Sequence, residues 1–289
     1  MFILLCKISH DKEFDSKNSA GPIPHFHYLC HHKYSNLFMQ TAERSSGHDP
    51  SEQVIYNRCL YAYVAASEIV KAEIIELGSG EGYGIQMLAP LAKRYLAVDK
   101  FDTDISGHAN VEFRKQILPS LAGIEDNSFD FAVTFQVIEH IQDDKAFVNE
   151  IHRVLKPGGK LLLTTPNRLM SLTRNPWHIR EYTAVELKNV LESVFSSVEM
   201  KGVYGSQKVM DYHLKNKASV AKITRFDIFK LQYRLPRQLL QIPYDIMNRL
   251  NRRRLLGENA GLVNHVSTAD YSINDASESC FDLFAIAVK

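Results

Sequence analysis

The segment 78–84, in which every second residue is glycine, is the part of the chain best suited to bind a ligand. The apolar pair Ile74 and Ile75 precedes it and a helix-like run follows, so we predict a strand, a tight turn and the start of a helix. Glycine adopts positive φ freely and lets a ligand lie against main-chain N–H groups. Such a turn is typical of sites for nucleotide-like ligands.

The residues around this turn indicate which ligand fits. A dinucleotide fingerprint requires a glycine three residues after Gly80, and that position is Tyr83, which disfavours a dinucleotide oxidoreductase. Glu76 and Glu81 would repel a phosphate group but favour a ligand that is positively charged and carries no phosphate. S-adenosylmethionine (SAM) is such a ligand. Asp99 ends the next predicted strand, about twenty residues further on, where it would accept the protons of both ribose hydroxyls.

Further elements must position these residues. Strands are predicted at 127–135 and 160–165, and the apolar spacing between them predicts a helix over 143–155. A helix is also predicted over 51–70, and a capping box at Thr183–Glu186 opens another.

The chain resembles the class I SAM-dependent methyltransferases of the "type 11" group in five stretches that follow the family's order: ELGSGEGYG, AVDK, NSFDFAVTFQVIEH, RVLKPGG and LLLTTPN. The resemblance covers residues 41–204 and resumes at 280–289. It implies an enzyme that uses SAM, with an α/β fold. The expected sheet is Rossmann-like, seven-stranded and mostly parallel, with helices on both faces and a helical insertion before the last strand.

A second resemblance concerns the acceptor. Thr165-Pro166-Asn167 and the stretch 175–182 are similar to methyltransferases of cell-surface glycan synthesis. They imply O-methylation of a small or lipid-linked acceptor such as a glycan intermediate. A quinone-type methyltransferase and a catalytically silent SAM-binding adaptor subunit remain alternatives.

The resemblance also implies the donor-binding residues. Gln116 stands where the family has an acidic residue beside the adenine, and its amide could still accept a hydrogen bond from the adenine amino group. Gln136, just past the fourth strand, is expected near the transferred methyl group. The full donor set comprises Glu76, Gly78, Ser79, Gly80, Gly82, Asp99, Gln116, Ile117 and Gln136.

Methyl transfer is an in-line displacement that needs a base when the acceptor is a hydroxyl, and three residues are candidates for catalysis. His178 is the best single candidate for the base, with a loop histidine of structural role as the alternative. Glu139 and His140 lie in a stretch that resembles the E-x-x-E-H metal motif of some quinone and small-RNA methyltransferases. Gln136 replaces its first glutamate, which weakens a site for Mg²⁺, and no metal site is predicted. Glu139 and His140 therefore act as metal ligands, as catalytic or acceptor-orienting groups, or as structural hydrogen-bonding groups.

The chain divides into four predicted parts: a leader or flap at 1–50, a SAM-binding core at 51–205, a basic helical insertion at 206–279 and a terminal strand at 280–289. Residues 208–254 hold twelve Lys or Arg against three Asp, a local charge of +9, with apolar residues interleaved. This insertion suits an anionic membrane surface or an anionic acceptor, and a merely solvated cap is the alternative.

Bulk properties limit the other possibilities. The net charge of +1 gives no global field for nucleic acid, and no nucleic-acid partner is expected. The four cysteines have no metal or disulfide spacing, no stretch is long enough to span a membrane, and the apolar start is shorter than a signal peptide. We expect a cytoplasmic protein, with peripheral contact at the inner membrane face through 208–254. The spacing of the histidines near Cys30 matches no standard zinc pattern, so we expect residues 1–50 to form a solvated leader or a substrate-side flap and not a metal site.

Overall fold

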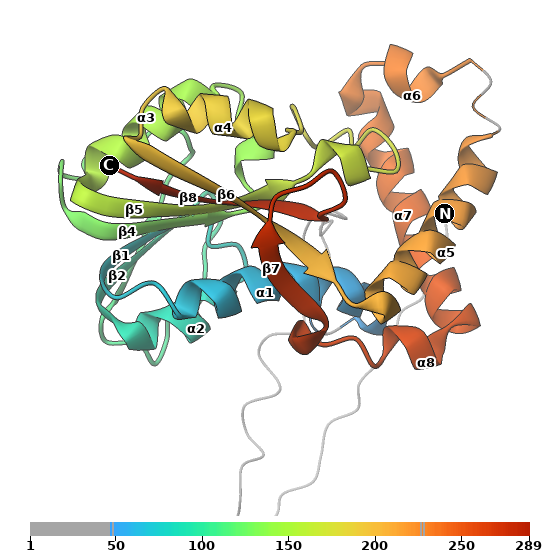
Figure 1. Cartoon of the computed structure of the whole chain (residues 1–289), viewed down its shortest axis with the longest axis horizontal. Helices are drawn as coiled ribbons and strands as arrows, with labels where there is room; N and C mark the ends of the chain where they lie inside the picture. Colours follow the sequence, from blue (N-terminus) through green and yellow to red (C-terminus); the bar gives the residue numbers. More distant parts are fainter. Residues whose placement is uncertain (1–46, 48, 226, 228) are drawn as a thin grey trace, which may run out of the picture. The chain divides into compact units, whose positions relative to one another are not determined.

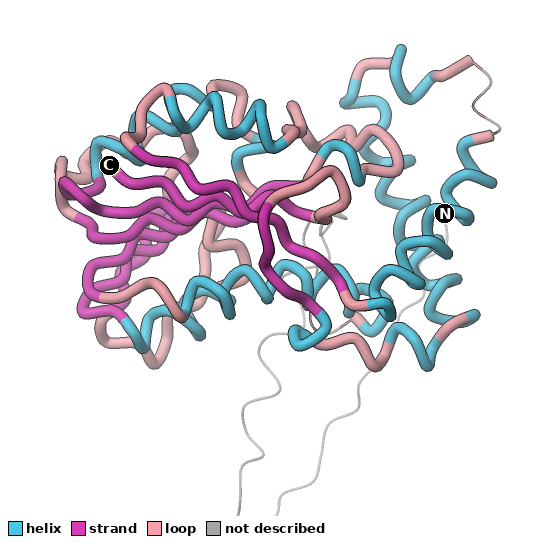
Figure 2. Tube along the Cα trace, in the orientation of Figure 1, coloured by secondary structure: helices cyan, strands magenta, loops and turns pink. Residues whose placement is uncertain are grey.

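The computed structural model describes residues 47, 49–225, 227 and 229–289. The expected leader and its histidine cluster therefore lie almost entirely outside the described residues. Eight strands form one sheet in the order β3-β2-β1-β4-β5-β8-β6-β7 (Figures 1 and 2). Their bounds are β1 Ala72–Leu77, β2 Ala92–Asp99, β3 Val111–Lys115, β4 Phe129–Phe135, β5 Leu155–Pro166, β6 Ser197–Gly205, β7 Tyr271–Asp275 and β8 Asp282–Val288.

The first five strands are parallel, and β8 runs antiparallel to both β5 and β6. This arrangement confirms the predicted Rossmann-like α/β class. The sheet has one strand more than the predicted seven, because β7 pairs antiparallel with the edge of β6. Tyr271 of β7 is buried and Ile273 is half-buried, whereas the residues between and after them are exposed, as in a short edge strand. The segment between β6 and β8 is therefore not wholly helical.

Both faces of the sheet are covered by helices. α1 (Gln53–Ser67) and α2 (Tyr83–Leu88) cover one face, whereas α3 (Asp144–Val154) and α4 (Ala184–Glu192) cover the other (Figure 1). Burial on both faces explains the nearly continuous apolar runs of the central strands. The capping box predicted at the start of α4 is confirmed, since the Thr183 hydroxyl and the Glu186 carboxylate each bond the other residue's main-chain N–H.

Between β6 and β7 the chain forms a group of helices that we call the cap: α5 (Gln207–Thr224), α6 (Leu231–Arg234), α7 (Arg237–Glu258) and α8 (Ala260–Val263). Short 3₁₀ turns occur elsewhere: η1 (Pro50–Glu52), η2 (Ala89–Leu91), η3 (Ile138–His140), η4 (Arg168–Met170) and η5 (Thr268–Asp270). Among the described residues, no helix combines the length and the apolar character needed to cross a membrane.

Polar side chains fasten the cap internally and to the core. Asn251 of α7 is buried; its amide donates to Asn216 Oδ1 of α5 at 2.7 Å, and its own Oδ1 accepts from the Ser219 hydroxyl at 2.6 Å. Arg252 of α7 donates to Glu52 of η1 at 3.2 Å. These contacts set the inner face of α7 against the core near α1.

Candidate active site

The glycine turn after β1 adopts the backbone that its sequence predicts. Gly78, Gly80 and Gly82 have φ values of +83°, +55° and +84°. A Cβ on Gly78 would lie 2.4 Å from Val137 Cγ2, so the turn packs directly against the segment that leads into η3. A Cβ on Gly80 would meet nothing within 4 Å, so the turn borders open space on that side. Main-chain groups can approach a ligand there, as SAM binding requires.

Asp99 closes the same turn from the neighbouring strand. Its carboxylate is buried, with Oδ2 accepting from the Gly80 N–H and Oδ1 from the Phe101 N–H, both at 2.9 Å. Ser79 is buried in the turn, and its hydroxyl lies 3.3 Å from that of Thr103. The fold therefore brings the glycine turn and Asp99 together, as the sequence predicts.

Glu76 lies beneath the turn, buried at the carboxyl end of β1. The Tyr63 hydroxyl donates to its Oε1 at 2.8 Å and the Tyr95 hydroxyl to its Oε2 at 2.7 Å. Burial raises the pKa of Glu76 to about 7, against the lowering effect of the two hydrogen bonds and with a further raising effect of Asp99. Gly84 leaves room for this carboxylate, since a Cβ there would lie 2.3 Å from Glu76 Oε1. The two tyrosines were not anticipated from the sequence.

The remaining donor-side residues lie at two other strand ends. The Gln116 N–H donates to the Asp99 carbonyl at 2.9 Å, and Ile117 beside it is 76% exposed. Gln136 follows β4 with a φ of +58°, unusual for a residue with a side chain. Its N–H donates to the Thr164 carbonyl at 2.9 Å and its side-chain amide to the Thr164 hydroxyl at 3.3 Å. Gln136 also lines the same cavity as Glu139, His140 and His178.

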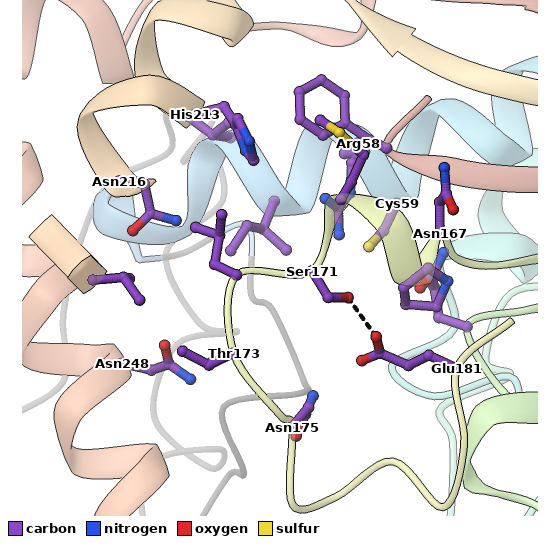
Figure 3. A pocket seen from close by; sticks show the side chains of 18 of the residues that line it. Arg58, Cys59, Asn167, Ser171, Thr173, Asn175, Glu181, His213, Asn216 and Asn248 are labelled. Atoms are coloured by element: carbon purple, nitrogen blue, oxygen red, sulfur yellow. Dashed lines mark hydrogen bonds between the residues drawn. The ribbon is translucent and has the colours of Figure 1, made fainter. Parts of the chain in front are cut away.

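His178 lies in the loop between η4 and α4, with both ring nitrogens engaged. Its Nδ1 is 2.7 Å from Glu181 Oε1, and its Nε2 is 2.9 Å from the amide nitrogen of Asn175. The hydrogen-bond network assigns the ring proton to Nδ1, because the carboxylate can only accept and the amide nitrogen can only donate. The Ser171 hydroxyl donates to the other oxygen of Glu181 (Figure 3).

Glu139 and His140 meet this loop from η3. Glu139 is buried; its Oε2 accepts from the Thr165 hydroxyl at 2.9 Å and its carbonyl from the Ile179 N–H at 2.7 Å. His140 Nδ1 lies 3.2 Å from the Trp177 carbonyl, and its ring stands edge-on to that of His178 at 5.0 Å. The three candidates predicted from sequence are therefore neighbours in space.

One carboxylate and two imidazoles are also a possible metal donor set. Within the described residues, Glu139, His140 and His178 are the group that could hold an ion, each offering a ligand atom within 4.8 Å of the others. Several of their atoms already bond Thr165, Trp177 or Glu181. This arrangement accounts for their positions without an ion.

These residues line part of a cavity of about 240 Å³ that the cap helps to enclose. Side chains from α1, the loop 167–181, α5 and α7 surround it (Figure 3). The wall includes twelve polar side chains to which the sequence assigned no donor-binding or catalytic role, and five of these are asparagines. They are Arg58, Ser171, Thr173, Tyr212, His213, Tyr244, Arg252 and Asn167, Asn175, Asn216, Asn248 and Asn251. Asn167 and Asn175 lie in the stretches that resemble glycan methyltransferases. No motif marks the other ten, since α1, the loop 167–181, α5 and α7 all contribute to them.

Arg58 is the charged group of α1 at this cavity. Its Nε lies 3.1 Å from Asp282 Oδ2 at the start of β8. Burial raises the pKa of Asp282, and Arg58 and Gln136 oppose that effect. The pair joins the first helix to the middle of the sheet directly beside Gln136.

The loop that carries His178 is held on both sides. Arg180 and Tyr182 both donate to Asp144 of α3, the tyrosine hydroxyl at 2.8 Å. On the cap side, the Trp177 indole donates to Asp245 of α7 at 2.9 Å, and Arg174 donates to the Gln232 carbonyl of α6 at 3.0 Å. A movement of the cap would therefore displace the loop that carries His178.

The chain is similar to known proteins. A family profile described as "Methyltransferase domain" matches residues 75–163. A relative from Mycolicibacterium smegmatis named "Probable S-adenosylmethionine-dependent methyltransferase" is 30% identical over 251 residues, 82% of this chain and 87% of the relative. A similarly named relative from Mycobacterium tuberculosis is 34% identical over 178 residues, 58% of this chain and 62% of the relative.

Two further proteins are similar over a shorter part of the chain or at lower sequence identity. A ubiquinone biosynthesis O-methyltransferase from Xanthomonas oryzae pv. oryzae is 30% identical over 115 residues, 37% of this chain and 48% of that enzyme. Among solved structures, the YcgJ protein from Bacillus subtilis matches with a TM-score of 0.48 and 18% identity, covering 79% of this chain and 98% of that protein.

Proposed function

Because the chain belongs to the S-adenosylmethionine-dependent methyltransferases, we propose that it methylates a hydroxyl oxygen of a small or lipid-linked acceptor such as a glycan intermediate. The observation that carries this proposal is the His178–Glu181 pair in the wall of a cavity that amide and hydroxyl side chains line in part. Amide and hydroxyl side chains can bond the hydroxyls of a sugar.

The glycine turn supports a donor site on its open side. The open side of Gly80 and the carboxylate of Asp99 fit the nucleoside part of SAM, which supplies an electrophilic methyl group on a sulfonium. Gln136 lines the cavity and its neighbour Val137 packs against Gly78, so donor and acceptor would meet near the ends of β4 and β5.

In the proposed reaction the acceptor oxygen forms its bond to the methyl carbon as the carbon–sulfur bond breaks. The hydroxyl proton passes to His178 Nε2, and Glu181 holds Nδ1–H and stabilises the resulting imidazolium. The acceptor hydroxyl takes the place that the Asn175 amide holds beside Nε2. The electron pair of the broken carbon–sulfur bond stays on sulfur, and S-adenosylhomocysteine leaves.

A quinone-type O-methyltransferase is the second candidate, and the ubiquinone enzyme's similarity to part of the chain favours it. The same base could serve a phenolic hydroxyl. The amide and hydroxyl groups among the lining residues favour the glycan acceptor, because a quinone ring and its tail offer few hydrogen-bonding groups.

Isotope labelling distinguishes a glycan acceptor from a quinone acceptor. The full chain is incubated with SAM carrying a labelled methyl group and with separated glycan, glycolipid and quinone extracts, and products are identified by mass spectrometry. We expect label in a sugar methyl ether. Label only in quinones would overturn the glycan proposal, and SAM binding without any labelled product would favour a silent adaptor.

The base is tested by changing His178 to Gln. We expect kcat to fall about 10²- to 10⁴-fold while the Kd for SAM stays unchanged, since the ring acts on the acceptor proton alone. His265→Gln is the matched control, because His265 is exposed and does not line the cavity, so its kcat should stay unchanged. An unchanged kcat in His178→Gln would remove His178 from the mechanism.

A further inference from the structure

Helix α7 has the opposite polarity to an ordinary surface helix. Its cavity side carries Tyr244, Asn248 and the buried Asn251. Its other side carries four large aliphatic residues at helical spacing, namely Leu239, Ile242, Ile246 and Leu250, which are 64%, 58%, 53% and 57% exposed. A surface helix normally buries its apolar side and exposes its polar side. The outward side of α7 is therefore suited to a contact that the described residues do not provide.

The apolar surface extends beyond α7. Sixteen large hydrophobic residues are exposed in the described part of the chain, and ten of them lie between Ile223 and Leu250. We call this group the outer surface; it comprises Ile223, Phe229, Leu231, Tyr233, Leu235, Leu239, Ile242, Ile246, Met247 and Leu250. Scattered exposed apolar residues are ordinary, but a concentration on one segment marks an interaction surface.

The charges around the outer surface are positive. Residues 222–254 hold nine Lys or Arg and two Asp, so their net charge is 9 − 2 = +7. Both aspartates are used within the protein: Asp227 accepts from the Leu231 N–H at 2.6 Å, and Asp245 accepts from Trp177. Arg252 bonds Glu52 on the cavity side. Exposed basic residues, including Arg234 and Arg253, remain beside the apolar side chains.

We propose that the outer surface binds an anionic lipid membrane. Apolar side chains flanked by arginine and lysine match the boundary between acyl chains and anionic headgroups. With 22 residues, α7 is about 33 Å long and can lie flat in that boundary. A second copy of the chain fits less well, since a two-fold interface would set each +7 surface against itself.

The test uses the full chain and vesicles of phosphatidylcholine alone or mixed with phosphatidylglycerol. Sedimentation is measured at low and high salt. We expect binding to the anionic vesicles that weakens as salt rises. The double changes Ile242→Ser with Ile246→Ser, and Arg234→Glu with Arg253→Glu, should each weaken binding about tenfold or more. All four side chains are exposed, so folding should be preserved, as circular dichroism can verify.

Matched controls lie outside the cap. Val185→Ser changes an apolar residue of α4 that is 68% exposed, and Lys71→Glu with Lys93→Glu reverses two exposed charges near β1 and β2. Both controls should bind like the unchanged chain. Equal binding to neutral and anionic vesicles, or no loss in either cap variant, would overturn the proposal. Dimers in sedimentation velocity that Ile242→Ser with Ile246→Ser abolishes, without vesicle binding, would assign the surface to a second copy instead.

Discussion

At the scale of single residues, a comparison of Gly80 with Gly158 distinguishes the effect of a glycine on folding from its effect on donor binding. Gly80 and Gly158 both have positive φ, +55° and +77°, and both face open space where a Cβ would lie. Alanine at either position should cost about 1–2 kcal/mol of stability for the left-handed backbone. Only the Gly80 site borders the expected ligand.

We therefore expect Gly80→Ala to weaken SAM binding about tenfold or more, the effect of losing about 1.4 kcal/mol, and Gly158→Ala to leave it unchanged. Calorimetry with SAM, and with NAD as the competing ligand, measures both. Equal SAM affinity in the two variants would show that the donor does not lie against Gly80. Tight binding of NAD without SAM would contradict the donor assignment itself.

Glu76 gives a prediction for pH. Its folded pKa of about 7 lies above the ordinary value of 4.5, so the folded protein keeps a proton that the unfolded chain loses between these values. The stabilisation is complete below pH 4.5 and is lost as the pH rises through about 7, at up to about 1.4 kcal/mol per pH unit.

Denaturant unfolding of the donor-free protein at about pH 5 and about pH 8 measures this effect, and Glu76→Gln should remove Glu76's share of the difference. A positively charged donor nearby lowers the pKa of Glu76, so SAM binding should release protons at neutral pH. Calorimetry in buffers of different ionisation enthalpy detects that release. An unchanged pH dependence in Glu76→Gln would contradict the assignment.

At the scale of elements, η3 and the loop 167–181 bring the catalytic candidates together. Glu139 bonds Thr165 and His178 bonds Glu181, while Gln136 stands where a metal-binding motif has a carboxylate. We therefore expect initial rates to survive EDTA, and Gln136→Glu to introduce a response to Mg²⁺. Complete loss of activity with EDTA, restored by Mg²⁺ or Mn²⁺, would establish a metal site at Glu139, His140 and His178.

The elements also show what the sequence could predict. The glycine turn and Asp99 were recognisable because each depends on a few consecutive residues whose backbone preferences are strong. The additional strand β7 was not recognisable, because it is short, lies at the edge of the sheet and is separated from its partner β6 by a long insertion. Gln136, Glu139 and His140 were found through a motif.

The acceptor cavity was the least predictable part. Arg58, His213 and Asn248 come from three helices far apart in the sequence and share no spacing. Their role depends on packing between α1 and the cap, which a single sequence does not specify. The position of Glu76 was predicted, but its two tyrosine partners depend on the same tertiary packing.

At the scale of the whole molecule, the cap and the sheet should differ in local stability. The buried amide of Asn251 joins α7 to Asn216 and Ser219 of α5. Asn251→Leu would leave these partners unpaired, at a cost of about 1–3 kcal/mol confined to the cap. We expect faster amide hydrogen exchange in α5 and α7 and unchanged exchange in β4 and β5. Asn149→Leu is the control, since Asn149 is exposed on α3 and its amide bonds only its own helix. Uniform acceleration across the sheet would contradict an independently opening cap.

The two sides of α7 have a consequence for control of turnover. Asn248 and Leu250 are two residues apart, yet one lines the acceptor cavity and the other belongs to the outer surface. A rigid helix cannot tilt or rotate on one side alone, so a force on the outer surface reaches the cavity across about 10 Å, the width of one helix. Trp177, bonded to Asp245 of the same helix, carries that motion into the loop of His178. We therefore expect binding at the outer surface to change the affinity for the acceptor, and linkage then requires the acceptor to change binding at the outer surface by the same factor.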